Sequence, residues 1–227
     1  MIFFSRSFDR FLTVVVPLVV LGVVAFLEMA KIVSCVSACE DGPIENIQAL
    51  ITFAAFCLGV SLLRIKNPAW VRAFFAIGTF AALYITLEEI RYGQGLFGWG
   101  TPEFWAMVND QNETNLHNTS SWFDQKPRLL LEIGVVVGGI VIPAIKKWAP
   151  QRLPEKFSIV YPTSALTLTA CFAIGGHLYS SVLGTMGRQD LFVFDRNSEM
   201  EEVFLYWFIF LYFLFKRREL TSKESAR

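Results

Sequence analysis

Charged side chains are scarce in this sequence. They make up 18% of its 227 residues, whereas 54% are hydrophobic and 15% aromatic. Soluble domains carry about 25% charged residues. The formal net charge is zero, and we expect no nucleic-acid partner. The composition argues against a soluble domain and indicates an integral membrane protein.

Cysteine, histidine and the common catalytic motifs are also scarce or absent. The four cysteines have no zinc-knuckle spacing. Cys57 and Cys171 lie in apolar runs and are predicted to be buried, while Cys35 and Cys39 could form a disulfide if their connection faces an oxidising compartment. There is no phosphate-binding glycine loop, no GxSxG elbow and no HExxH helix. The two histidines are too few for a ceramidase-type hydrolase, so no known motif names a reaction.

Long apolar runs, in contrast, are abundant. A helix needs about 20 apolar residues to cross a bilayer core, and six segments meet this length. We predict an all-α, polytopic membrane protein with a single domain of six transmembrane helices, and an interfacial helix and loop between the third and fourth. The predicted segments are spans at residues 11–33, 44–64, 70–90, 128–148, 158–183 and 200–216, an outer loop at 91–127 and a cytoplasmic tail at 217–227.

The distribution of charge predicts the orientation. Most lysines and arginines fall at the two chain ends and in the connections after the second and fourth spans. Positive residues accumulate on the cytoplasmic side of short loops, so both termini are predicted to be cytoplasmic. Most aspartates and glutamates fall on the other side. Acids contribute little to orientation, so this acidic outer face needs its own explanation.

The outer loop is aromatic rather than simply polar. Thr101 and the proline after it predict a short helix over residues 102–109, because threonine caps helices and proline suits their first turn. Rings such as Trp99 and Trp105 favour the headgroup level of a membrane. The loop is therefore predicted to lie at the outer interface, as an anchor or as a site that positions a headgroup.

Paired glutamates at two span ends are the first candidates for a site. Glu201 and Glu202 begin the sixth span, where the helix dipole favours carboxylates, but Glu88 and Glu89 end the third span, where it does not. Neighbouring residues point about 100° apart on a helix. We predict that Glu89 faces the interior, with Gln94 about one turn beyond it.

The two histidines extend this candidate site. His177 lies in the outer half of the fifth span, and His117 lies in the outer loop, four residues after Glu113. Imidazole and carboxylate ligands suit zinc, iron or manganese, and calcium less well. The predicted metal ligands are His117, His177, Glu89 and Glu202. The alternative is a neutral His177 that forms a hydrogen bond to a neighbouring helix.

Three blocks of the outer region carry a resemblance. They are EEIRYGQ at 88–94, FGW at 97–99 and ETNLHN at 113–118. Together they resemble an uncharacterised family of bacterial multi-pass inner-membrane proteins with EEIxxGQ and ETNLHN blocks. The resemblance implies a bacterial inner membrane and blocks that act together, and it supplies no reaction.

Three functions remain open at this point. The first is a metal-dependent enzyme acting on a lipid or lipid-linked substrate at the outer leaflet. The second is a protein that binds or transports a cation or solute, and the third is a structural or assembly subunit whose aromatic sixth span contacts lipid or a membrane-protein partner. For the enzyme, the predicted residues are Glu89, Glu113 and Gln94 in catalysis and Asn115, Arg91, Trp99 and Trp105 in substrate binding.

Overall fold

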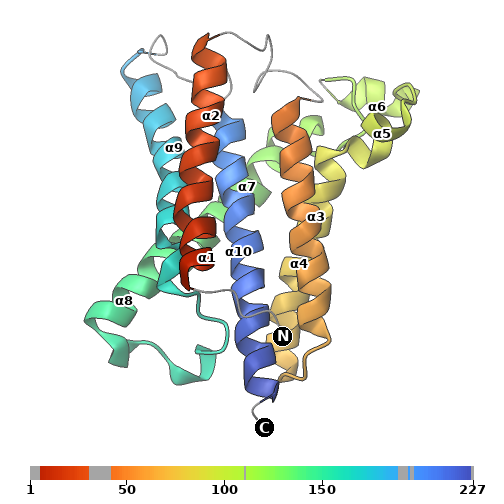
Figure 1. Cartoon of the computed structure of the whole chain (residues 1–227). Coiled ribbons are helices and arrows are strands. Elements are labelled where there is room, and N and C mark those ends of the chain that lie inside the picture. Colours follow the sequence, from red (N-terminus) through yellow and green to blue (C-terminus); the bar gives the residue numbers. More distant parts are fainter. Residues whose placement is uncertain (1–5, 31–41, 110, 189–193, 195–196, 226–227) are drawn as a thin grey trace.

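The computed structural model describes residues 6–30, 42–109, 111–188, 194 and 197–225. Within these residues the chain is helical and has no strand. Figure 1 shows long helices side by side, with α1 and the end of α10 at one end of the bundle and α5 and α6 at the other. The long helical stretches are α1 (Arg6–Arg10), η1 (Phe11–Val15) and α2 (Val16–Ala30), then α3 (Pro43–Leu63), α4 (Ala69–Glu89), α7 (Ser121–Val136) with η4 (Val137–Val141) and α8 (Ile142–Trp148), α9 (Thr167–Thr185) and α10 (Asn197–Ser225). The short ones are η2 (Arg91–Gly93), α5 (Gln94–Phe97), α6 (Glu103–Val108), η3 (His117–Thr119), η5 (Pro150–Arg152), η6 (Glu155–Phe157) and η7 (Ser164–Leu166).

In the part of the chain that the structure describes, five helical segments are long and apolar enough to cross a membrane. They match the first five predicted spans to within a few residues, except that the fifth begins at Ser164 rather than at 158. Pro162 explains the later start, because proline disfavours helix at the residue before it and has no backbone N–H. The segments are Ser7–Ala30, Pro43–Leu63, Ala69–Glu89, Gln125–Trp148 and Ser164–Thr185.

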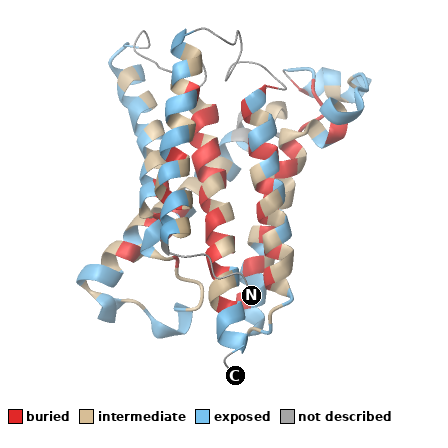
Figure 2. Ribbon diagram, in the orientation of Figure 1, coloured by how far each residue is buried: buried red, intermediate tan, exposed pale blue. Residues whose placement is uncertain are grey.

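The helix α10 contains the sixth predicted span. Its 29 residues extend about 43 Å at 1.5 Å per residue, and it carries charges at both ends. Figure 2 shows buried residues along much of its length. Phe204, Phe208 and Phe213 are all buried, and the helix packs most extensively against α3 and α9. The aromatic run therefore forms the centre of this chain, which counts against its predicted use as a surface for a partner.

Two π-helical turns lie just before prolines. The turn η1 precedes Pro17, and η4 precedes Pro143. A proline cannot donate to the carbonyl four residues before it, and its ring clashes with that carbonyl. A π-helical turn shifts the hydrogen bonds and accommodates the mismatch. At η1 the indole of Trp207 donates to the backbone carbonyl of Leu12 at 3.0 Å, which ties the first membrane helix to α10.

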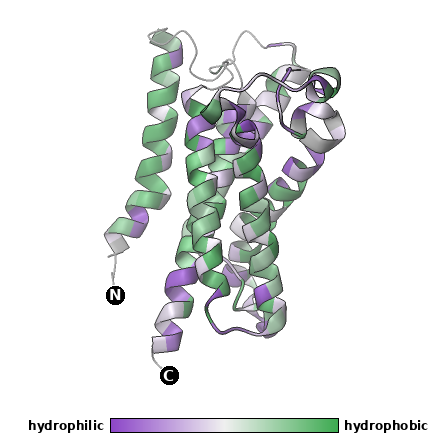
Figure 3. Cartoon of the chain, turned by 90° about the vertical axis from the view of Figure 1, so that its right-hand side faces the viewer, coloured by the Kyte–Doolittle hydropathy of each residue, from purple (hydrophilic) through white to green (hydrophobic). Residues whose placement is uncertain are grey.

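The outward faces of the long helices are apolar. Phe26, Ile77 and Phe80 are between 62% and 72% exposed, which would leave large apolar patches in water. Figure 3 shows hydrophobic residues along the bundle and hydrophilic residues mainly toward its ends. Cys57 and Cys171 belong to these outward faces, because both are exposed. Their predicted burial in the core is therefore wrong, and the apolar surroundings that the sequence indicated are those of a membrane-facing surface.

Glycines allow the closest helix contacts. A Cβ added to Gly139 would overlap the Cβ of Ala170 and approach Phe208 to 2.8 Å. A Cβ added to Gly59 would overlap the side chain of Thr79. Small residues at such contacts are typical of membrane bundles, because they let backbones approach closely.

We expect Gly139→Ala to destabilise the protein by about 1–3 kcal/mol, as overpacked cores do. Gly134 lies in the same continuous helix, and no atom of the other described residues lies within 4 Å of a Cβ added there. Gly134→Ala should therefore be neutral, or stabilising by up to about 1 kcal/mol, because alanine favours helix. Thermal unfolding in detergent measures both. Equal effects of the two substitutions would contradict the close approach of η4 and α9.

Candidate functional site

A cavity of about 320 Å³ lies between α4, α7 and α10. The cavity lies at the end of the bundle where α4 ends and where α7 and α10 begin. We call this end the acidic end of the bundle. The segment between α4 and α7, residues 90–120, is called the outer segment, and it contributes Gln111 and Asn118 to the lining. Tyr84 and Tyr206 add aromatic rings. The charged residues of the lining are Glu88, Glu89, Glu199, Glu202 and Arg128.

Both glutamates at the end of α4 line this cavity, although they point in different directions. Glu88 accepts hydrogen bonds from the hydroxyl of Tyr92 at 2.6 Å and from the backbone N–H of Leu116 at 2.8 Å. Burial and the hydrogen bond to Glu88 raise the pKa of Tyr92 above its usual value. The hydroxyl of Tyr92 therefore stays protonated and donates a hydrogen bond to Glu88. Glu89 accepts from the hydroxyl of Tyr206 at 3.1 Å. Glu88 thus holds the outer segment, while Glu89 is held by α10.

The other two glutamates of the lining belong to α10. The side-chain amide of Gln48 donates to the Glu199 carboxylate at 3.2 Å and to the Glu199 backbone carbonyl at 3.0 Å. Glu202 accepts from Nη1 of Arg128 at 3.0 Å. Each ionised carboxylate has about four acceptor positions. Such a group can therefore bind protein donors and a ligand at the same time.

Arg128 is shared between the cavity and a second group of acids. Besides Glu202, it donates from Nη2 to Glu201 at 2.6 Å and from Nε to Glu132 at 3.3 Å. Three carboxylates therefore share one guanidinium. Arginine suits this position, because its planar fork can bind several carboxylate oxygens at once.

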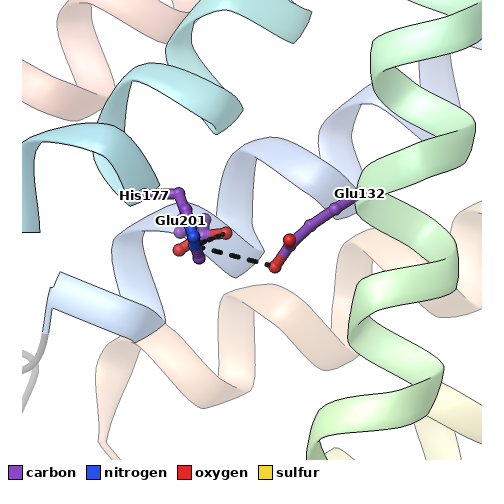
Figure 4. A group of neighbouring side chains, drawn as sticks. All are labelled: Glu132, His177 and Glu201. Atoms are coloured by element: carbon purple, nitrogen blue, oxygen red, sulfur yellow. Dashed lines mark ion pairs between the residues drawn. The ribbon is translucent and has the colours of Figure 1, made fainter. Parts of the chain in front are cut away.

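His177 completes the second group, which we call the His–Glu cluster: Glu132, His177 and Glu201 (Figure 4). Nδ1 of His177 lies 3.3 Å from Oε1 of Glu201 and 3.9 Å from Oε1 of Glu132. A Cβ on Gly176 would lie 3.9 Å from the Cβ of Glu201, so α9 and α10 run close together at this point. Three helices, α7, α9 and α10, thus bring the three side chains to one place.

Glu113 is the centre of the outer segment. Its carboxylate accepts from Arg91 at 3.1 Å, from the Asn115 amide at 2.7 Å and from the Asn118 amide at 3.0 Å. Glu113 and Asn115 are both buried. A buried carboxylate with several donors is well satisfied, so the ETNLHN block binds largely to itself and to Arg91.

Gln94 fixes the same segment from the α4 side. Its Oε1 accepts from the backbone N–H and the hydroxyl of Thr114, both at 2.8 Å, and its amide donates to Thr101 at 2.8 Å. The chain reaches this position through Arg91 and Tyr92, which have φ angles of 51° and 54°. Such left-handed conformations are uncommon for residues other than glycine. The network around Gln94 and Glu113 holds the turn in place.

The short helix predicted over residues 102–109 is present as α6, over Glu103–Val108. Its start differs in detail, because Pro102 occupies the cap position and Thr101 instead binds Gln94 and the backbone of Asn112. Trp99 stacks on Phe97 with ring centroids 5.6 Å apart. The segment is therefore aromatic and compact, and its position at the membrane interface stays a prediction.

The predicted site residues fall into separate groups. Glu89 and Glu202 line the cavity, and His177 lies in the His–Glu cluster. The acids beside His177 are Glu132 and Glu201, which were not among the predicted metal ligands. Those in the outer segment network are Glu113, Gln94, Asn115 and Arg91, with Trp99 and Trp105 in its aromatic part. The side chain of His117 and the pair Cys35 and Cys39 lie outside the described residues.

Comparisons with known proteins found no matching family model, no similar curated protein and no similar solved structure. The resemblance to an uncharacterised bacterial family therefore stays a prediction. The site has to be interpreted from its own chemistry.

Proposed function

We propose that this chain is a six-span protein of a bacterial inner membrane and binds a small organic cation in its acidic cavity. Both termini are cytoplasmic in this proposal, and α10 is the sixth span. The observation that carries the proposal is a cavity lined by four glutamates and, among the described residues, one arginine. The basic residues of the connections after α3 and α8, together with Lys216 and Arg218 of α10, support the orientation.

Charge favours a cation as the ligand. Ionised carboxylates in a membrane protein are costly unless they are paired, and like charges close together repel. Arg128 already serves Glu201 and Glu132 as well as Glu202. An ammonium group in the cavity would neutralise part of the remaining negative charge. It carries only hydrogen-bond donors, so it would not compete with the carboxylates for the protein's donors.

Size and shape favour an organic cation over a bare metal ion. The 320 Å³ of the cavity falls at the lower end of small-molecule sites, which begin near about 300 Å³. Tyr84 and Tyr206 add aromatic rings, which attract ammonium and quaternary ammonium groups. Free amines and amine-bearing lipid headgroups share this chemistry.

Binding is favoured over transport by the residues that lie between the cavity and the opposite end of the bundle, where α3 ends and α4 begins. Thr79 is buried there, and its hydroxyl donates to the backbone carbonyl of Phe75 in its own helix. The core around it is apolar, with Leu62, Val71 and Phe75 fully buried. These residues give a solute no continuous polar route through the bundle.

We expect choline, ethanolamine or spermidine to raise the thermal stability of the purified protein in detergent containing EDTA. A ligand at 100 times its Kd stabilises by about 2.7 kcal/mol. Glu89→Gln combined with Glu202→Gln should abolish this gain and should itself be no less stable, because it removes repulsion. Glu103→Gln, at an exposed acid of α6, is the matched control. The proposal fails if no amine stabilises the protein, or if the double variant responds like the wild type.

A further inference from the structure

We infer that the His–Glu cluster of Glu132, His177 and Glu201 is a binding site for one divalent transition metal ion of the zinc type. It is distinct from the amine site proposed above, since none of the three residues lines the cavity. Arg128 lies between the two sites and contacts acids of both.

The spacing of the ligand atoms fits a shared ion. One atom from each residue lies within 4.8 Å of the other two, and Nδ1 of His177 is 3.3 Å from Oε1 of Glu201 and 3.9 Å from Oε1 of Glu132. Ligands about 2.0–2.1 Å from a tetrahedral ion are roughly 3.3–3.4 Å apart. Only small side-chain rotations would bring all three atoms onto one ion.

A second observation concerns Glu201 itself. Its side chain is 4% exposed, and its buried Oε1 receives no hydrogen bond from the residues that the structure describes. Its other oxygen is bound by Arg128. An unsatisfied carboxylate oxygen in the interior is costly. Because Oε1 faces His177, an ion at the centre of the cluster would satisfy it.

The ligand set indicates the class of ion. One imidazole and two carboxylates suit zinc, and iron or manganese with further ligands, whereas calcium prefers oxygen ligands alone. Glu132 and Glu201 contribute two negative charges, and Arg128 is shared with Glu202 as well. The single positive charge of Arg128 cannot neutralise all three carboxylates. A divalent ion would neutralise the negative charge that remains.

The site would keep a coordination position for an exogenous ligand. Three protein ligands leave the fourth tetrahedral position open, as catalytic zinc sites do. The His177 side chain is 48% exposed, whereas Glu132 and Glu201 are 14% and 4% exposed. Access to the ion would therefore be from the His177 side, and water bound there would be acidified.

The test is metal binding by the purified chain. Protein stripped with EDTA is equilibrated with Zn²⁺, desalted and analysed by elemental mass spectrometry, and Co²⁺ serves as a visible-absorption probe of tetrahedral coordination. We expect one ion per chain. We expect each of three substitutions to weaken metal binding by at least about tenfold: His177→Ala, Glu132→Gln and Glu201→Gln. Tenfold is about the smallest loss of affinity that follows from substituting residues next to metal ligands.

Two controls keep the outcome clear. Leu178→Ala changes an exposed neighbour on α9 and should bind metal normally. His177→Cys keeps a zinc ligand and should retain binding that His177→Ala loses, while size-exclusion profiles verify folding. The inference is overturned if the wild type retains no metal, or if His177→Ala retains as much. Either result leaves the amine site untouched, because that site is measured with EDTA present and with other variants.

Discussion

Arg128→Met is expected to destabilise the protein by about 3–5 kcal/mol, the usual cost of removing one partner from a buried ion pair. Arg128 donates to Glu201, Glu202 and Glu132, and its side chain is 22% exposed. Without it these carboxylates repel one another where α7 and α10 meet. The free energy of unfolding of many domains is only about 5–15 kcal/mol in total. Most of the variant should therefore elute as aggregate. Fluorescence-detected size exclusion and thermal unfolding measure the loss.

Two comparisons isolate the electrostatic cause of this loss. Lys126→Met removes an exposed cation two residues earlier on α7 and should have almost no effect on stability. Adding Glu201→Gln and Glu202→Gln to Arg128→Met should restore part of the stability, because neutral amides neither repel nor need a counter-charge. If the triple variant is no more stable than Arg128→Met, lost packing rather than unpaired charge explains the result.

The helices of this fold follow from the sequence, because a membrane demands long apolar segments with internally bonded backbones. Five of the predicted spans are present as helices of sufficient length. The fifth begins late because Pro162 acts through backbone sterics that hydropathy ignores. The central position of α10 was not predictable either, because hydropathy cannot tell a lipid-facing aromatic run from one buried among other helices.

The acidic end was predictable as a region but not as a set of contacts. Adjacent helix positions differ by about 100°, so Glu201 faces His177 while Glu202 faces the cavity beside Glu89. The sequence offers no reason to choose between the two. Their directions depend on the rotation of α10 about its axis, which is set by packing. The oblique path of α7, also set by packing, brings Glu132 to the same place (Figure 1).

The outer segment shows a different limit of sequence interpretation. Its polar residues were predicted to catalyse or to bind substrate, and those roles stay predictions. Glu113, Gln94 and Asn115 bind instead to groups of the same segment and to Arg91. Residues that accept and donate hydrogen bonds serve a site and a buried loop equally well, and only their partners distinguish the two uses.

Glu113→Ala therefore separates a structural role from a purely catalytic one. The carboxylate is 6% exposed and accepts from Arg91, Asn115 and Asn118, so its loss should cost the outer segment about 3 kcal/mol. We expect chymotrypsin to cut residues 97–105 at least tenfold faster, since cleavage follows the open population and 1.4 kcal/mol is about a factor of ten. Glu103→Ala, at an exposed acid of α6, should leave the rate unchanged. Equal cleavage of Glu113→Ala and wild type would show that the network does not hold the segment, and would favour the predicted catalytic role of Glu113.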